Sequence, residues 1–98
     1  MAKADNNGPF RLEGRLTVDE VPGVYHDHLD WKHDGPPAAI DLSGLEATDS
    51  SAVALMLEWL SWARKAGKSL ELQNPPDSLH TIAGLSQVED ILGWKNVE

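Results

Sequence analysis

The chain has 98 residues, of which 41% are apolar, and this length and composition predict one small folded domain. Its net charge of −8 argues against binding to nucleic acid, and the absence of cysteine excludes disulfides and thiolate chemistry. No apolar stretch is long enough to cross a bilayer and the first residues do not resemble a signal peptide, so we expect a cytoplasmic protein without direct membrane insertion.

The first part of the chain predicts a tail, a strand and a helix. We expect residues 1–8 to form a flexible N-terminal tail and residues 9–98 to form the single domain. Residues 10–16 alternate between apolar and polar side chains, which is typical of a half-buried strand. The Thr-x-x-Glu pattern at residues 17–20 predicts a capping box, and the helix that follows should end near residues 31–32.

The middle of the chain predicts a buried strand followed by a long helix. Residues 38–42 are mostly apolar, which favours a central strand covered on both faces, and a loop should follow it. We expect Asp49 to cap a helix over residues 50–66, and Gly67 to end that helix as its C′ residue.

The last part of the chain predicts a third strand and short helical segments. Residues 70–73 should form the strand, Asp77 should cap a helix over residues 78–85, and residues 88–92 should form a last helical turn or an edge segment. Trp94 should dock onto the core. The predicted fold class is therefore α/β, with a small, mixed or mostly parallel sheet of about four strands packed with helices.

The predicted long helix carries more apolar surface than one sheet would cover. Beside the stripe that should face the sheet, Leu55, Trp59 and Trp62 form a second stripe at spacings of four and three. One interpretation is that a neighbouring helix covers this second stripe. The other is that at least Leu55 and Trp62 stay partly exposed and form a docking patch for another protein.

We find no pattern that predicts catalysis, a cofactor or a metal site. No two of the four histidines have the i, i+4 spacing of a zinc pair on a helix. A Gly-x-Ser-x-Gly elbow and a glycine-rich phosphate loop are both absent from the sequence. We therefore expect no catalytic residue, no cofactor and no metal.

Two hydroxyls, Ser50 and Ser51, lie at the predicted start of the long helix. A serine at this position commonly caps the helix. A phosphate here would also be stabilised by the free N–H groups of the first turn. Beside Asp49, such a phosphate would add negative charge and could repel a partner without unfolding the domain.

The segment IDLSGL at residues 40–45, followed by Asp49, Ser50, Ser51 and a leucine-rich helix, resembles the STAS domain. This is the family of anti-sigma factor antagonists and of the cytoplasmic tails of sulfate transporters. The likeness extends from about residue 12 to residue 92 and implies a STAS-like fold. It also identifies Ser50 as the position of the family's key hydroxyl.

Within this family, the chain looks most like the stand-alone STAS subunit of the Mla-type phospholipid ABC transporter. The likeness includes ARKAGKSLEL at residues 63–72 and LHTIAGL at residues 79–85. It implies a non-enzymatic adaptor that binds the cytoplasmic ATPase and lies at the inner membrane through that partner. The transporter it serves would maintain the lipid asymmetry of the outer membrane.

On this interpretation the partner surface combines the start of the long helix, its second stripe and the helix over residues 78–85. The candidate partner-binding residues are Ser50, Ser51, Leu55, Trp59 and Trp62. The alternative is an anti-sigma factor antagonist whose partner is an anti-sigma factor kinase that phosphorylates Ser50. A third class, a small-ligand binder, would be favoured by a sizeable apolar pocket.

Overall fold

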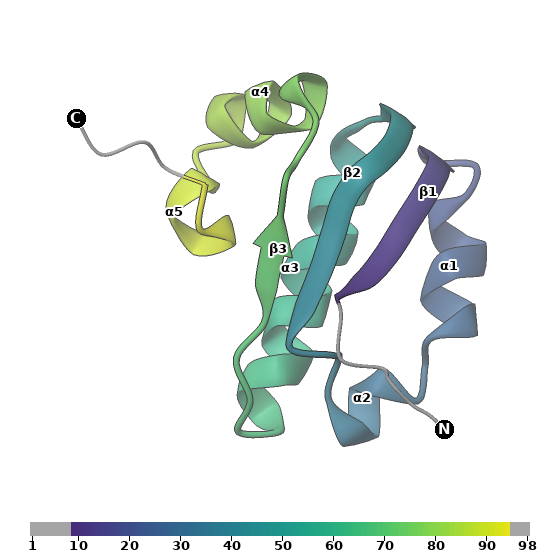
Figure 1. Ribbon diagram of the computed structural model, residues 1–98, viewed down its shortest axis with the longest axis vertical. Helices are drawn as coiled ribbons and strands as arrows, with labels where there is room; N and C mark the ends of the chain where they lie inside the picture. Colours follow the sequence, from purple (N-terminus) through teal and green to yellow (C-terminus); the bar gives the residue numbers. More distant parts are fainter. Residues whose placement is uncertain (1–8, 95–98) are drawn as a thin grey trace.

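One parallel sheet backed by a long helix organises residues 9–94, which are the residues that the computed structural model describes (Figure 1). The elements follow one another as β1 (Phe10–Leu16), α1 (Val21–Asp27), α2 (Trp31–Asp34), β2 (Ala39–Thr48), α3 (Ser50–Lys65), β3 (Glu71–Gln73), α4 (Asp77–Leu85) and α5 (Glu89–Leu92). The predicted tail at residues 1–8 lies outside the described residues. None of these helices is long and apolar enough to span a bilayer.

The sheet has the order β1-β2-β3 and both pairings are parallel, which confirms the predicted α/β class. Residues 9–94 contribute three strands rather than about four, because residues 88–92 form the helical turn α5 rather than an edge segment. In Figure 1 helix α3 lies behind the sheet, and none of the helices described for residues 9–94 covers the front face. The prediction that the central strand is covered on both faces is therefore wrong, and in β2 buried and more exposed positions alternate at its start.

Strand β2 is longer than predicted, because residues 43–48 continue the strand instead of forming a loop. Its later residues pair with β1 through two register shifts, one between Arg11 and Glu13 and one between Gly14 and Arg15. At Gly44 the two strands approach so closely that an added Cβ would lie 2.7 Å from the carbonyl oxygen of Leu12. Gly44, which lies where a loop was predicted, is needed here for a close approach of two backbones.

The single helix predicted after residue 17 is two short helices, α1 and α2, joined by a turn at residues 28–30. The capping box is half formed. Glu20 accepts hydrogen bonds from the N–H and the hydroxyl of Thr17, at 2.9 and 2.6 Å, but the hydroxyl does not cap the helix. The bend lets α2 wrap around one end of the sheet, where Trp31 packs against Phe10 with ring centroids 5.3 Å apart.

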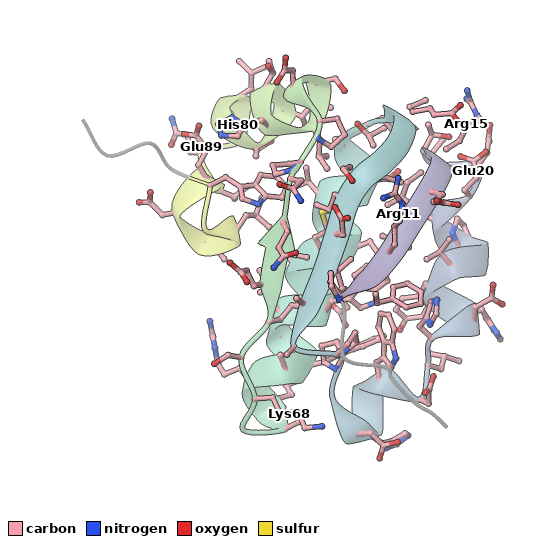
Figure 2. All side chains as sticks on the ribbon, in the orientation of Figure 1. Arg11, Arg15, Glu20, Lys68, His80 and Glu89 are labelled. Atoms are coloured by element: carbon pink, nitrogen blue, oxygen red, sulfur yellow. The ribbon has the colours of Figure 1, made fainter. Side chains whose placement is uncertain are left out.

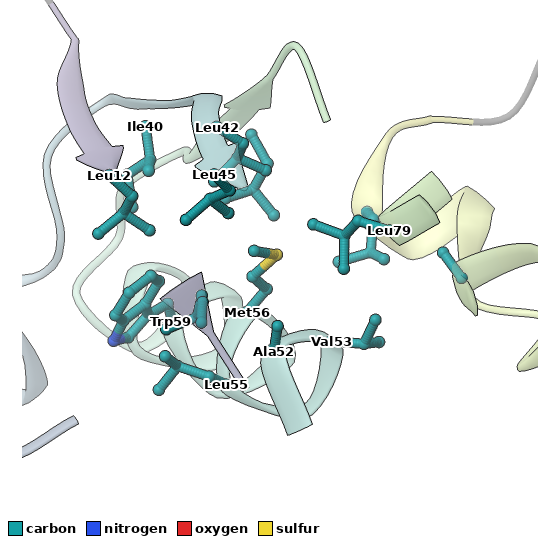
Figure 3. Packing of buried hydrophobic residues seen from close by; sticks show 14 of the residues in the cluster. Leu12, Ile40, Leu42, Leu45, Ala52, Val53, Leu55, Met56, Trp59 and Leu79 are labelled. Carbon is teal, nitrogen blue, oxygen red and sulfur yellow. The ribbon is translucent and has the colours of Figure 1, made fainter. Parts of the chain in front are cut away.

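The core fills the space between the sheet and α3 (Figure 3). Its strand side chains include Leu12, Ile40 and Leu42, and Met56 meets them from α3. The predicted docking of Trp94 is confirmed, since its side chain is buried and its Nε1 donates to the carbonyl oxygen of Leu72 at 2.8 Å.

The ends of the helices differ in how well local signals predicted them. The long helix α3 starts and ends within one residue of its predicted bounds, and Gly67 follows it with φ +71°. Asp77, in contrast, does not cap α4: it is the first helical residue, and Pro76 is in the N-cap position.

Candidate functional site

The carboxylate of Asp49 organises the point where β2 ends and α3 begins. Its Oδ1 accepts a hydrogen bond from the N–H of Ser51 at 2.9 Å and another from the Ser51 hydroxyl. Its Oδ2 accepts from the N–H of Val18 at 2.9 Å, which ties the connection between β1 and α1 to the start of α3. The predicted N-cap is thus confirmed, and it also fixes a second chain segment.

These hydrogen bonds favour the charged form of Asp49. The Ser51 hydroxyl and then the Val18 N–H hold the pKa of the Asp49 carboxyl below its ordinary value. A fixed negative charge at the positive end of α3 also suits the helix dipole. The start of α3 is therefore a pre-organised, acidic feature at this edge of the molecule.

The two candidate serines have different environments at this edge. Ser51 is partly buried and its hydroxyl is engaged by Asp49. Ser50 is exposed, and its side chain has no hydrogen-bond partner among residues 9–94. Ser50 is thus available to a partner or to a modifying enzyme, whereas Ser51 mainly supports the cap.

The second stripe of α3 lies in the core. Leu55, Trp59 and Trp62 are only 3%, 0% and 1% exposed, so the expectation that Leu55 and Trp62 stay partly exposed is wrong. Helices α1 and α2 cover the stripe: the ring of Tyr25 lies 5.5 Å from that of Trp62, and the ring of Trp31 lies 5.2 Å from that of Trp59. The alternative interpretation, coverage by a neighbouring helix, is confirmed. Because both tryptophan side chains are buried, they cannot contact a partner directly and can only hold the residues of a docking surface in position.

A groove between α1 and α3 lies beside Ser51 and has a volume of about 440 Å³. Its walls combine apolar side chains with a hydroxyl and a carboxylate, from Val21, Pro22, Tyr25, Ser51, Ala54, Leu55 and Glu58. Val18, on the connection that Asp49 holds, is 64% exposed. Val21 and Tyr25, on α1, are functional candidates that the sequence did not single out. The available signal was the Thr-x-x-Glu pattern at residues 17–20, which predicted a helix start directly before them.

The first residues of α4 lie at the same edge. The hydroxyl oxygens of Thr48, at the end of β2, and Ser78, in the first turn of α4, are 3.5 Å apart. The exposed side chains of α4 include Thr81 and Leu85, the latter 81% exposed. The predicted contribution of residues 78–85 to a partner surface stays a prediction, and the structure places the start of that helix beside the end of β2.

The carboxylate of Asp41 holds two chain segments together. Its Oδ1 accepts from the N–H of Ser43 at 3.0 Å and from Nδ2 of Asn74 at 3.2 Å, which joins β2 to the segment after β3. The Ser43 N–H, followed by the Asn74 amide, holds the pKa of Asp41 below its ordinary value.

Across the described residues, no three His, Asp or Glu side chains are grouped as a metal site would require.

A cleft with a volume of about 530 Å³ lies at the opposite end of the sheet. Phe10, His28 and Trp31 line it, with Lys68 beside them. The rings pack on one another, with His28 stacked on Trp31 at a centroid distance of 4.1 Å and Phe10 edge-on to Trp31. These rings mainly stabilise the turn between α1 and α2, so the cleft offers little support for the small-ligand class.

Comparison with known families gives one match over nearly the whole chain. Residues 1–93 match a family model described as Mlab, STAS domain. This range includes every helix and strand described above, from β1 to α5. No curated protein matches the chain in sequence.

Proposed function

Because the chain belongs to the STAS domain family, whose members are generally non-catalytic binding domains, we propose that it is an adaptor subunit of a phospholipid-transport ABC system. It would bind the cytoplasmic ATPase and lie at the inner membrane through that partner. The transporter would maintain the lipid asymmetry of the outer membrane. The description of the matching family model, which names Mlab, supports this choice among the roles of STAS domains.

One observation carries the proposal: the Asp49 carboxylate fixes the start of α3 to the connection before α1, and the exposed Ser50 hydroxyl and the apolar α1–α3 groove lie side by side there. Ser50 is exposed at the start of α3, and the α1–α3 groove begins at the next residue. A pre-formed surface loses little conformational entropy on binding. With Glu58 in the groove and a net charge of −8, this surface suits an ATPase segment that presents basic and apolar side chains.

The test measures binding of the full chain to the purified ATPase by isothermal titration calorimetry. Ala54 is an exposed residue of the groove, and Ala54→Arg would fill the groove and offset the negative charge of Glu58. We expect affinity to fall by about tenfold or more. Ser50→Ala should give a smaller loss of several-fold, as for one polar contact, which corresponds to about 1 kcal/mol.

Ala38→Arg is the matched control. Ala38 is also exposed, and it lies before β2 at the opposite end of the sheet from α3's first turn. This variant should bind like the wild type, and circular dichroism should show that both arginine variants are folded. Unchanged affinity of Ala54→Arg would exclude the groove as the docking site.

The second candidate is an anti-sigma factor antagonist, and the exposure of Ser50 favours it. An anti-sigma factor kinase could reach this hydroxyl, while the Ser51 hydroxyl is engaged by Asp49. After incubation with the cognate kinase and ATP, mass spectrometry should then find phosphate on Ser50 and none on Ser51. Such a result, together with no binding of the ATPase, would replace the transporter role by the antagonist role.

A further inference from the structure

The basic end of α3 differs in charge from the rest of this acidic chain. Arg64, Lys65 and Lys68 lie within five consecutive residues, whereas the whole sequence has 8 lysines and arginines against 16 acidic residues. Arg11 and Arg15 already face carboxylates, at 2.9 Å from Glu13 and 3.5 Å from Glu20 respectively. Within residues 9–94 no carboxylate lies at ion-pairing distance from the three cations at the basic end.

A groove of about 360 Å³ lies beside these cations. Its apolar lining comes from α3, the segment after it and α5, through Leu60, Ala63, Leu70 and Ile91, and its cations are Arg64 and Lys68. Ile91 is 57% exposed. Cations at a helix C-terminus are explained by the helix dipole, but the dipole gives no reason for an exposed isoleucine opposite them.

Lys68 borders both this groove and the cleft that Phe10 and Trp31 line, and its ammonium group is held at α2. Its Nζ donates to the carbonyl oxygen of Asp34 at 2.6 Å, and its backbone N–H donates to the carbonyl oxygen of Ala63 at 2.8 Å. Figure 2 shows Lys68 at the lower end of the molecule, far from Arg15 and Glu20 at the upper end. Among residues 9–94, Arg64 is therefore the exposed cation of the groove that has no polar partner.

We propose that this groove binds a short acidic segment of a second protein. An apolar side chain of that segment would enter between Leu60 and Ile91, and a neighbouring carboxylate would meet Arg64. The concave apolar floor fits a protruding side chain better than a flat membrane surface.

The groove is separate from the surface in the proposed function. Helix α3 has 16 residues, and at 1.5 Å per residue its two ends are about 24 Å apart. The acidic segment and the partner at Ser50 could therefore bind at the same time. This inference does not depend on the identity of the partner at Ser50.

The test uses the full chain and a short fluorescein-labelled peptide with one leucine between pairs of glutamates, followed by fluorescence anisotropy. We expect saturable binding that weakens with added salt. Binding should fall about tenfold or more for Arg64→Glu, and several-fold for Ile91→Ser. A peptide with lysines in place of glutamates should not bind, and one with alanine in place of leucine should bind more weakly.

Two matched variants act as controls for charge and for exposed apolar surface. Arg15→Glu makes the same charge change at the other end of the molecule, and Leu85→Ser removes an exposed apolar side chain outside the groove. Both should bind the peptide like the wild type. Equal loss in the Arg15 and Arg64 variants, or no saturable binding, would overturn the proposal. So would Arg64-dependent binding to phosphatidylglycerol vesicles in place of the peptide.

Discussion

Replacing Trp62 by phenylalanine should destabilise the domain more than the same replacement at Trp59. Both indoles lie on α3 and are buried, at 1% and 0% exposure, so the two variants lose nearly the same apolar volume. The difference lies at the indole nitrogen. Nε1 of Trp62 donates to Oε2 of Glu58 at 3.1 Å, whereas Nε1 of Trp59 is buried without a hydrogen-bond partner among the described residues.

The size of the difference follows from these two environments. Trp62→Phe removes a hydrogen bond with a net contribution of about 1 kcal/mol. Trp59→Phe removes a buried, unpaired donor whose desolvation costs about 1–3 kcal/mol. The free energy of unfolding should therefore be lower for Trp62→Phe than for Trp59→Phe by about 2 kcal/mol or more. For a domain of this size, each kcal/mol corresponds to about 4–8 °C in Tm.

Urea titrations followed by far-ultraviolet circular dichroism measure both variants under the same conditions, and equal m-values would show that the comparison concerns the folded state. Equal midpoints, or a lower midpoint for Trp59→Phe, would refute the reasoning. Alanine at either position should cost about 3–5 kcal/mol. This is a large fraction of the stability of a small domain, so loss of partner binding in such variants would report unfolding rather than a lost contact.

Two further predictions concern the backbone and the pH dependence. Gly44→Ala should lower the free energy of unfolding by about 1–3 kcal/mol, because the new Cβ would lie 2.7 Å from the carbonyl oxygen of Leu12. Gly23→Ala, with nothing within 4 Å of the new Cβ, should be neutral or stabilising, and equal urea midpoints for the two would contradict the close approach of β1 and β2. The lowered pKa of Asp49 implies a contribution to stability that is complete above its ordinary pKa and is lost as the pH falls through the lowered value. Asp49→Asn should therefore be less stable than the wild type at neutral pH and lose less further stability below about pH 4, whereas parallel acid profiles would contradict this.

Local signals explain which parts of the fold the sequence could predict. Helix α3 was predicted within one residue at each end, because a capping aspartate and a terminal glycine act on their own helix. The extension of β2 through residues 43–48 was not predicted, because it depends on pairing with β1, about thirty residues earlier. The break at residues 28–30 likewise follows from packing of α2 around the end of the sheet rather than from a local helix breaker.

The candidate site likewise has features that local sequence signals predict and features that depend on distant parts of the chain. The place of Ser50 and Ser51 at the start of α3 follows from the cap signal, and the structure bears out that position. The exposure of Leu55 and Trp62 was mispredicted, because it depends on whether helices from another part of the chain cover them. The hydrogen bond from Val18 to Asp49 spans 31 residues, and no local pattern indicates it.

The central claim is that the chain docks on an ATPase through the Ser50 edge and the α1–α3 groove. Hydrogen–deuterium exchange with mass spectrometry, on the full chain with and without the ATPase, tests this most directly. We expect slower exchange on binding in residues 17–25 and 50–58, with no change in residues 64–70. Protection that leaves residues 50–58 unchanged, or no protection at a saturating concentration of the ATPase, would contradict it.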